Sequence, residues 1–310
     1  MFEGYVIVAL ALAYLGILFL VAWSGDLWMR SWRGDIGRPL IYALSIAVYC
    51  TTWTFFGSVG RSAQSQGYDF LAVYIGPILM FVVGWPILRR VVQLSKAQNI
   101  TSVADFIAAR YGKSPAVAAI VTLLAVVGTL PYVALQLKAV SISTETLLGG
   151  NPLLPFKLPL FGVPETAFLT AVFLAIFAIL FGTRHIDATE HQDGLILAIA
   201  AESVVKLLAF LTVGIFVVFF AFGDFSGFVT NFYGSADVQG FLDVSLSGSA
   251  WLTIGFLSFI CILLLPRQFH VTVVENHSEN ELRRARWLIP LYLVLINLFV
   301  VPIAAAGILL

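Results

Sequence analysis

Charged side chains are scarce in this sequence. Lys, Arg, Asp and Glu account for 11% of the 310 residues, whereas 60% are hydrophobic and the mean hydropathy is +0.97. An ordinary globular domain has about 25% charged and about 45–50% apolar residues. Because a soluble core cannot bury this much apolar surface, the composition excludes an ordinary soluble domain and predicts a chain that lies in a lipid bilayer.

An excess of charge of either sign is also absent. The 17 basic and 17 acidic residues cancel. Binding to nucleic acid depends on Lys and Arg side chains that neutralise phosphates. Without a basic excess, we expect no nucleic-acid partner.

Cysteine is rare, and the motifs of common enzymes are missing. Cys50 and Cys261 lie far apart in apolar segments, which excludes a disulfide framework and the ligand spacing of a metal site. Residues 182–194 carry His, Asp and Glu but no HExxH spacing, so we expect a solvated loop there. No nucleophile elbow, phosphate loop or dinucleotide-binding motif occurs in a strand–turn–helix setting, so we expect no catalytic residue and no cofactor.

Long apolar runs make up most of the chain. A membrane-spanning helix needs about 20 apolar residues, and the first run lacks the basic start of a cleaved signal peptide, so we expect a retained helix. Eight segments are expected to cross the membrane: residues 4–23, 39–58, 69–88, 115–137, 165–181, 194–222, 249–266 and 287–309. The expected fold class is therefore an all-α polytopic membrane protein.

Basic residues are unevenly distributed among the loops. Thirteen of the 17 Lys and Arg fall on one side of the expected membrane, including those of the polar link 267–286, and only Arg61 and Lys157 fall on the other. The positive-inside rule places the thirteen in the cytoplasm and the N-terminus outside. The loop of residues 223–248 has no Lys or Arg and fits the outer side.

The stretch CTTWTFFGSVG, Cys50 to Gly60, places three threonines and three further small or glycine residues at membrane depth. Glycine weakens a helix interior by about 1 kcal/mol relative to alanine. Secondary transporters interrupt helices at such places and bind ions and solutes with the freed backbone groups. Close helix packing through small residues is the alternative.

Two other segments carry polar or ionisable side chains. Glu202 and Lys206 are four residues apart on one helix face, in the order that favours an ion pair. They form either a neutralised structural pair or part of an ion-coupling or proton-coupling device. Tyr132 and Gln136 share another helix face, which either lines a wet cavity or forms hydrogen bonds between helices.

Four blocks of the sequence together resemble the sodium:solute symporter family, the sodium/glucose cotransporter-like branch of the LeuT-type fold. The blocks are residues 45–77, 100–112, 181–194 and 266–286. Within that family, YCTTWTFFGSVG, GYDFLAVYIGP and ESVVKLLAFL look like the symporter-like input domain of bacterial sensor histidine kinases of the Cbr type.

The resemblance implies one symporter-like membrane domain over residues 1–310. It would contain an extra N-terminal helix (1–24), a first five-helix repeat (38–222) and the first two helices of an incomplete second repeat (249–310). We therefore expect an N-terminal part of a longer protein of the bacterial inner membrane. In that protein a cytoplasmic histidine kinase region would follow, with a response regulator as its partner.

The resemblance also implies the sites. The backbone carbonyls of Ala47 and Cys50 would form half of a sodium site. A weaker second break is expected at residues 253–259. Residues of three core helices would line the solute: Thr51, Thr52, Trp53, Thr54, Tyr132, Gln136, Trp251, Gly255, Ser258 and Phe259. The candidates for coupling or gating are Glu190, Glu202 and Lys206.

The expected function is binding, and transport by alternating access, of a small organic solute with sodium or proton coupling. By resemblance the solute is an amino acid or organic acid, with histidine as one candidate, and its occupancy would bias the kinase. One alternative is a sodium:solute symporter that stands alone without a kinase. The other is a structural or assembly subunit of the membrane that binds no specific solute.

Overall fold

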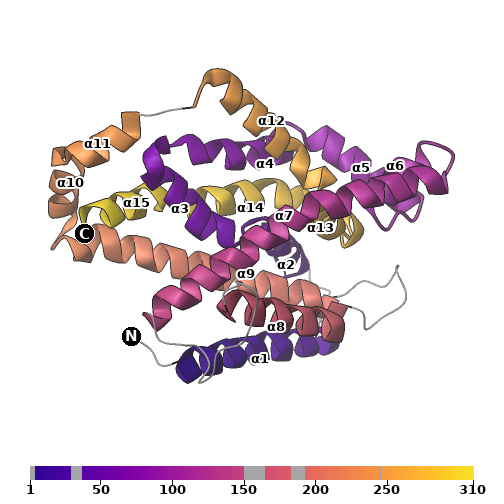
Figure 1. Cartoon of the computed structure of the whole chain (residues 1–310). Coiled ribbons are helices and arrows are strands. Elements are labelled where there is room, and N and C mark those ends of the chain that lie inside the picture. The colour runs from indigo at the N-terminus through magenta and orange to yellow at the C-terminus, as the bar shows by residue number, and fades with distance from the viewer. Residues whose placement is uncertain (1–3, 29–36, 150–164, 183–192, 244–245) are drawn as a thin grey trace.

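The fold is built of helices (Figure 1). The computed structural model describes residues 4–28, 37–149, 165–182, 193–243 and 246–310, and these residues form helices and connecting turns without a β-strand. The predicted all-α class is confirmed for this part of the chain.

The helices follow one another along the chain in a simple order. The first half forms α1 (Gly4–Trp28), α2 (Gly37–Ile46), α3 (Ser58–Arg61), α4 (Ala72–Val82), α5 (Trp85–Ala97), α6 (Val103–Ala109) and α7 (Pro115–Leu148). The second half forms α8 (Glu165–Gly182), α9 (Asp193–Phe216), α10 (Phe225–Gly234), α11 (Ala236–Asp243), α12 (Gly248–Leu264), α13 (Pro266–Phe269), α14 (Glu279–Asn297) and α15 (Val300–Leu309). Short 3₁₀ or π-helical turns lie between or beyond them: Ala47–Tyr49, Trp53–Gly57, Ser62–Gln66, Asp69–Leu71, Val217–Ala221 and His270–Val274.

Several of these helices are long and apolar enough to cross a membrane. Four qualify in the described residues: Gly4–Gly25, Pro115–Leu148, Asp193–Ala221 and Glu279–Leu309. Three bent helix pairs raise the number to seven if each pair is one span: Gly37–Tyr49 with Trp53–Gln64, Asp69–Val82 with Trp85–Ala97, and Gly248–Leu264 with Pro266–Val274. The protein is thus a polytopic membrane protein, while the expected count of eight spans stays a prediction.

Local sequence signals account for where the helices begin and end. Ser114 and Ser278 cap α7 and α14 by accepting hydrogen bonds from backbone N–H groups, and Glu281 completes a capping box at Ser278. Pro115 occupies the first turn of α7, where its missing N–H is not needed. Gly149 ends α7 in the left-handed conformation with φ of 59°, which glycine adopts without strain.

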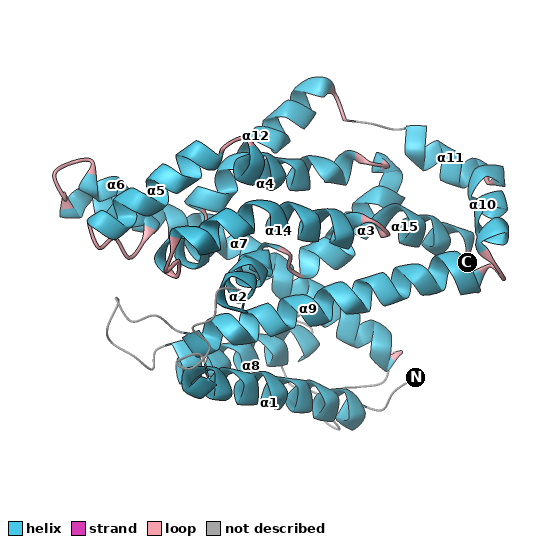
Figure 2. Ribbon diagram, turned by 180° about the vertical axis from the view of Figure 1, so that it is seen from behind, coloured by secondary structure: helices cyan, strands magenta, loops and turns pink. Residues whose placement is uncertain are grey.

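The core lies around α2, which sits between α9 and α14 (Figure 2). Its side chains Tyr42 and Ile46 are among the most buried of the described residues. α4 packs along α12, and α1 packs along α9. The most apolar windows of α1 and α7 are not buried, as expected for helices that face lipid.

The two ends of the bundle differ in charge. α5, which carries Arg89, Arg90 and Lys96, lies with α6 at one end in Figure 1, and α10 and α11 lie at the opposite end. α10 and α11 contain no Lys or Arg. This arrangement agrees with the loop assignment made from the sequence, and the outward N-terminus stays a prediction.

The second break is not where the sequence predicted it. The expectation of a break at residues 253–259 is wrong, because α12 runs without interruption from Gly248 to Leu264. The chain bends by 54° after α12, where Leu265 is extended with φ of −70° and ψ of 125°. Pro266 explains the position, since proline disfavours the helical conformation in the residue before it and has no N–H to donate.

Candidate functional site at the break after α2

The helix that begins with α2 is interrupted at membrane depth. Its 3₁₀ turn ends at Tyr49, Cys50 is extended with φ of −80° and ψ of 106°, and helical structure resumes at Trp53. The two halves are bent by 59° relative to each other. The break predicted from CTTWTFFGSVG is therefore confirmed.

Two backbone carbonyls lose their helical donors at this break. In a continuous α-helix each N–H donates to the carbonyl four residues earlier. Here the Cys50 N–H donates to Ala47 O at 2.9 Å instead of to Ile46 O, and the Thr54 N–H donates to Thr51 O at 2.9 Å instead of to Cys50 O. The carbonyls of Ile46 and Cys50 therefore need other donors, because no water in the bilayer core supplies them.

Side chains from distant segments supply these donors. Gln268 Nε2 of α13 donates to Ile46 O at 3.3 Å, and Lys206 Nζ of α9 donates to Cys50 O at 3.0 Å. Gln268 is fully buried, and its Oε1 has no hydrogen-bond partner among the described residues. One carbonyl predicted to bind sodium thus accepts a hydrogen bond from a lysine ammonium, and the other, Ala47 O, already accepts the Cys50 N–H.

Lys206 reaches the break as part of an ion pair. Its Nζ lies 3.1 Å from Glu202 Oε1, and the side chains are 17% and 38% exposed, respectively. The pair predicted from the four-residue spacing is confirmed. Its ammonium connects α9 to the chain after α2, so the pair has a structural role whether or not it also couples transport. Glu190, the third coupling candidate, lies outside the described residues.

α7 contributes polar side chains to the break after α2. The Thr52 hydroxyl donates to Gln136 Oε1, which joins two residues predicted for the solute site. Arg267 of α13 donates from Nη2 to the Tyr132 hydroxyl oxygen at 2.9 Å, and its Cζ lies 5.4 Å from the centre of the Tyr132 ring. We call the following residues the break cluster: Ile46, Cys50, Thr52, Tyr132, Gln136, Lys206, Arg267 and Gln268.

Arg267 and Gln268 were not predicted as site residues. The sequence assigned them to the polar link 267–286 on the inner side, because they are charged or polar and follow an apolar segment. We also expected the link to be partly helical, and its first part is: α13 and the turn His270–Val274 are helical, and most of their side chains are buried. Pro266 was the available signal, since it ends α12 and starts a new helix with these two residues.

The other residues of the break pack toward α4. The Trp53 ring lies 6.5 Å from the Tyr74 ring, and a Cβ at Gly57 would come within 2.6 Å of the Trp53 indole. Thr54 is buried. Thr51 is half-buried, and its carbonyl accepts the Thr54 N–H.

The predicted solute residues of α12 make their contacts elsewhere. Ser258 Oγ lies 3.0 Å from the carbonyl oxygens of Ala72 and Gly255. The Trp251 indole N–H donates to the buried Asp69 carboxylate. The Phe259 ring lies against Gly84, at the bend between α4 and α5. These residues hold α12 on α4, and their role in binding solute stays a prediction.

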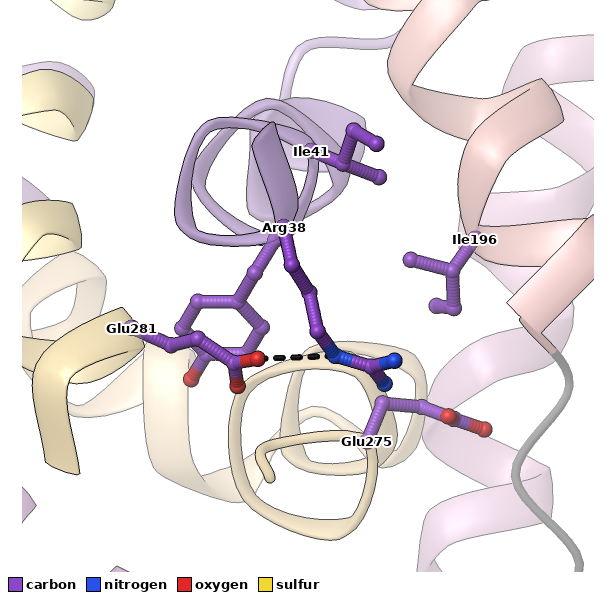
Figure 3. A pocket seen from close by; sticks show the side chains of 6 residues that line it. Arg38, Ile41, Ile196, Glu275 and Glu281 are labelled. Atoms are coloured by element: carbon purple, nitrogen blue, oxygen red, sulfur yellow. Dashed lines mark hydrogen bonds and ion pairs between the residues drawn. The ribbon is translucent and has the colours of Figure 1, made fainter. Parts of the chain in front are cut away.

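A small pocket lies at the start of α2 (Figure 3). It is a cavity of about 10 Å³, room for one water, lined by Arg38, Ile41, Tyr42, Ile196, Glu275 and Glu281. Arg38 donates to Glu281 Oε1 and to Asp193 Oδ1, both at 2.9 Å. These ion pairs join α2, α9 and α14. The cavity is too small to hold a solute.

Comparison with known proteins gives a partial match. Over 114 residues the chain is 29% identical to an uncharacterized symporter, YhjB, of Bacillus subtilis (strain 168). The match covers 36% of this chain and 23% of the relative, so the chain spans about a quarter of that protein's length. Over this part of its length the chain is therefore similar to a protein named a symporter. No family model and no solved structure matches the chain, so the LeuT-type fold, the division into repeats and the kinase relation stay predictions.

Proposed function

We propose that the chain is a secondary-transporter-like membrane domain that binds a small organic solute at the break after α2 and moves it by alternating access. The observation that carries this proposal is that three segments form hydrogen bonds with one interrupted helix. α7 bonds to the Thr52 hydroxyl, α9 to the Cys50 carbonyl and α13 to the Ile46 carbonyl. Interrupted helices of this kind form the midplane sites of secondary transporters. The symporter name of the relative from Bacillus subtilis supports the same function.

We also propose that Lys206 replaces a sodium ion at the Cys50 carbonyl. A bound cation and a lysine ammonium both supply the positive charge that a freed carbonyl attracts. The ammonium lies 3.0 Å from that oxygen. Coupling to protons, or no coupling at all, therefore agrees better with these contacts than sodium coupling does.

A role in signalling is proposed on the sequence blocks alone. In the kinase version, solute occupancy would favour one state of the membrane domain and so bias a cytoplasmic histidine kinase, which requires different solute affinities in the two states. The alternative is a symporter that stands alone, which the name of the Bacillus relative favours. Autophosphorylation of the full-length protein in vesicles, measured with and without a transported solute, distinguishes the two.

Uptake into proteoliposomes tests the solute site. We expect saturable uptake of a labelled amino acid, and for Thr52→Val a rise in KM of about fivefold, because the variant loses one hydrogen bond of about 1 kcal/mol while keeping its shape. Thr212→Val is the matched control, since Thr212 is exposed on α9 and bonds only within its helix. Equal KM values for both variants and the wild type would place the solute elsewhere.

A further inference from the structure

Arg267 brings a positive charge to the break cluster, and within the described residues no acidic side chain forms an ion pair with it. Its contacts in the described part of the chain are the Tyr132 hydroxyl at 2.9 Å and the Tyr132 ring at 5.4 Å. Neither neutralises the guanidinium. Tyr132 lies near the midpoint of α7, which runs from Pro115 to Leu148, so the charge lies far from both ends of that helix.

The other charges close to the break cancel each other. Lys206 and Glu202 form an ion pair at 3.1 Å. Lys206 Nζ lies 3.0 Å from Cys50 O, and Arg267 directly precedes Gln268, whose Nε2 donates to Ile46 O, so both cations lie near the break. The described groups therefore sum to one net positive charge. Ionisable groups at membrane depth are costly and normally have a partner of opposite charge.

A buried hydrogen-bond donor without an acceptor among the described residues lies one helical turn from Tyr132. A guanidinium has five N–H donors, and Tyr132 accepts one of them. Gln136 lies one turn after Tyr132 on the same face of α7, and its Nε2 is buried without a partner among the described residues. An anion with two oxygen atoms matches the planar fork of an arginine better than a single-atom anion does.

We propose that Arg267 is the anion-binding group of the solute site and that the solute carries a carboxylate, as amino acids and small organic acids do. The carboxylate oxygens accept hydrogen bonds from the Arg267 guanidinium and from Gln136 Nε2. Tyr132 is a positioning residue that orients the guanidinium through its hydroxyl and its ring. The inference rests on the proposed solute-binding function and names the chemical class of the solute.

The first test compares ligand classes on the wild-type full-length protein in nanodiscs. The probes are the L-amino acids, short mono- and dicarboxylates, glucose, putrescine and histamine, and the readout is the rise in melting temperature. We expect every stabilising compound to carry a carboxylate, and histamine, which is histidine without its carboxylate, to give no rise. Equal stabilisation by histidine and histamine, or stabilisation by glucose or putrescine alone, would overturn the inference.

The second test uses arginine variants, checked for a single species by size exclusion. We expect Arg267→Gln to weaken binding of the best carboxylate at least about tenfold, because it removes charge-assisted hydrogen bonds, and Arg267→Lys to restore part of that loss. The matched control is Arg286→Gln, since Arg286 also lies over aromatic rings, Trp85 and Trp287, and outside the break cluster. Wild-type affinity in Arg267→Gln would contradict the inference.

The outcomes separate this inference from the function on which it rests. Binding of neutral or cationic solutes, with normal affinity in Arg267→Gln, would agree with the proposed solute site. It would contradict the assignment of the solute as a carboxylate. Binding of no compound of any class, together with no uptake, would contradict the proposed function and the carboxylate assignment together.

Discussion

Lys206→Met is expected to lower the stability of the protein and to create a response to sodium that the wild type lacks. Methionine keeps the length and apolar character of the lysine side chain but cannot donate to Cys50 O or pair with Glu202. The loss of hydrogen bonds from a charged donor lowers the free energy of unfolding by about 1.5–3 kcal/mol. Thermal melting of the purified protein in nanodiscs measures this change.

The response of this variant to sodium tests whether the Lys206 ammonium replaces a sodium ion. Without the ammonium, the Cys50 carbonyl and the Glu202 carboxylate form a negatively charged site lined by oxygen atoms, which favours a cation. We expect NaCl, compared with choline chloride, to raise the melting temperature of Lys206→Met and to leave that of the wild type unchanged. Uptake by the wild type should likewise ignore a sodium gradient.

A double variant separates the two contacts of Lys206. In Glu202→Gln/Lys206→Met the unpaired carboxylate is removed, and only the Cys50 carbonyl lacks its donor. We expect its stability to lie between the wild type and Lys206→Met, and its sodium response to be small. A wild type that requires sodium for uptake or gains stability from it would show that the ammonium does not replace the ion.

Gly76→Ala is expected to disrupt the packing of α4 on α12. A Cβ at Gly76 would lie 2.6 Å from Gly255 O and closer still to the Phe259 backbone N, and it would overlap Ser258 Oγ. Two of these neighbours are backbone atoms that cannot rotate away, so the helices must separate. We expect destabilisation of about 3 kcal/mol, at the upper end of the range for overpacking, measured by thermal melting and by the yield of folded protein.

Other glycines provide matched controls for this variant. Gly255 and Gly128 lie within α12 and α7, and a Cβ added at either one meets no atom within 4 Å. Alanine at these positions should be neutral or stabilise by up to about 1 kcal/mol, because alanine favours helix more than glycine does. Similar losses at Gly76, Gly128 and Gly255 would mean that helix flexibility, and not close packing at Gly76, controls stability.

Local sequence patterns marked the interrupted helix as one of two alternatives, which the resemblance then favoured over close packing, and they indicated the ion pair directly. Threonines and glycines gathered in CTTWTFFGSVG mark a helix that is weak in its interior, and the break lies at Cys50 within that stretch. The four-residue spacing of Glu202 and Lys206 determines their contact on one helix. Both features depend on neighbours in sequence, which is why composition and spacing reveal them.

Contacts between distant segments could not be predicted in the same way. The partner of Cys50 O is 156 residues away in the chain, and no local pattern at either position indicates the contact. Arg267 and Gln268 were assigned to the polar inner link because polar residues after an apolar run usually leave the membrane. Ser258 and Trp251 have side chains that suit a solute site equally well, yet their polar atoms contact α4 or the turn before it.

The most direct test of solute binding at the break is protection of residue 52 from a thiol reagent. The chain has two cysteines, so Thr52→Cys is made in a Cys50→Ser/Cys261→Ser background, with Ser249→Cys, exposed at the start of α12, as the control. We predict that a saturating transported carboxylate slows alkylation at position 52 severalfold and leaves position 249 unchanged. Equal alkylation rates at position 52 with and without solute, in protein that still takes the solute up, would contradict a site at this break.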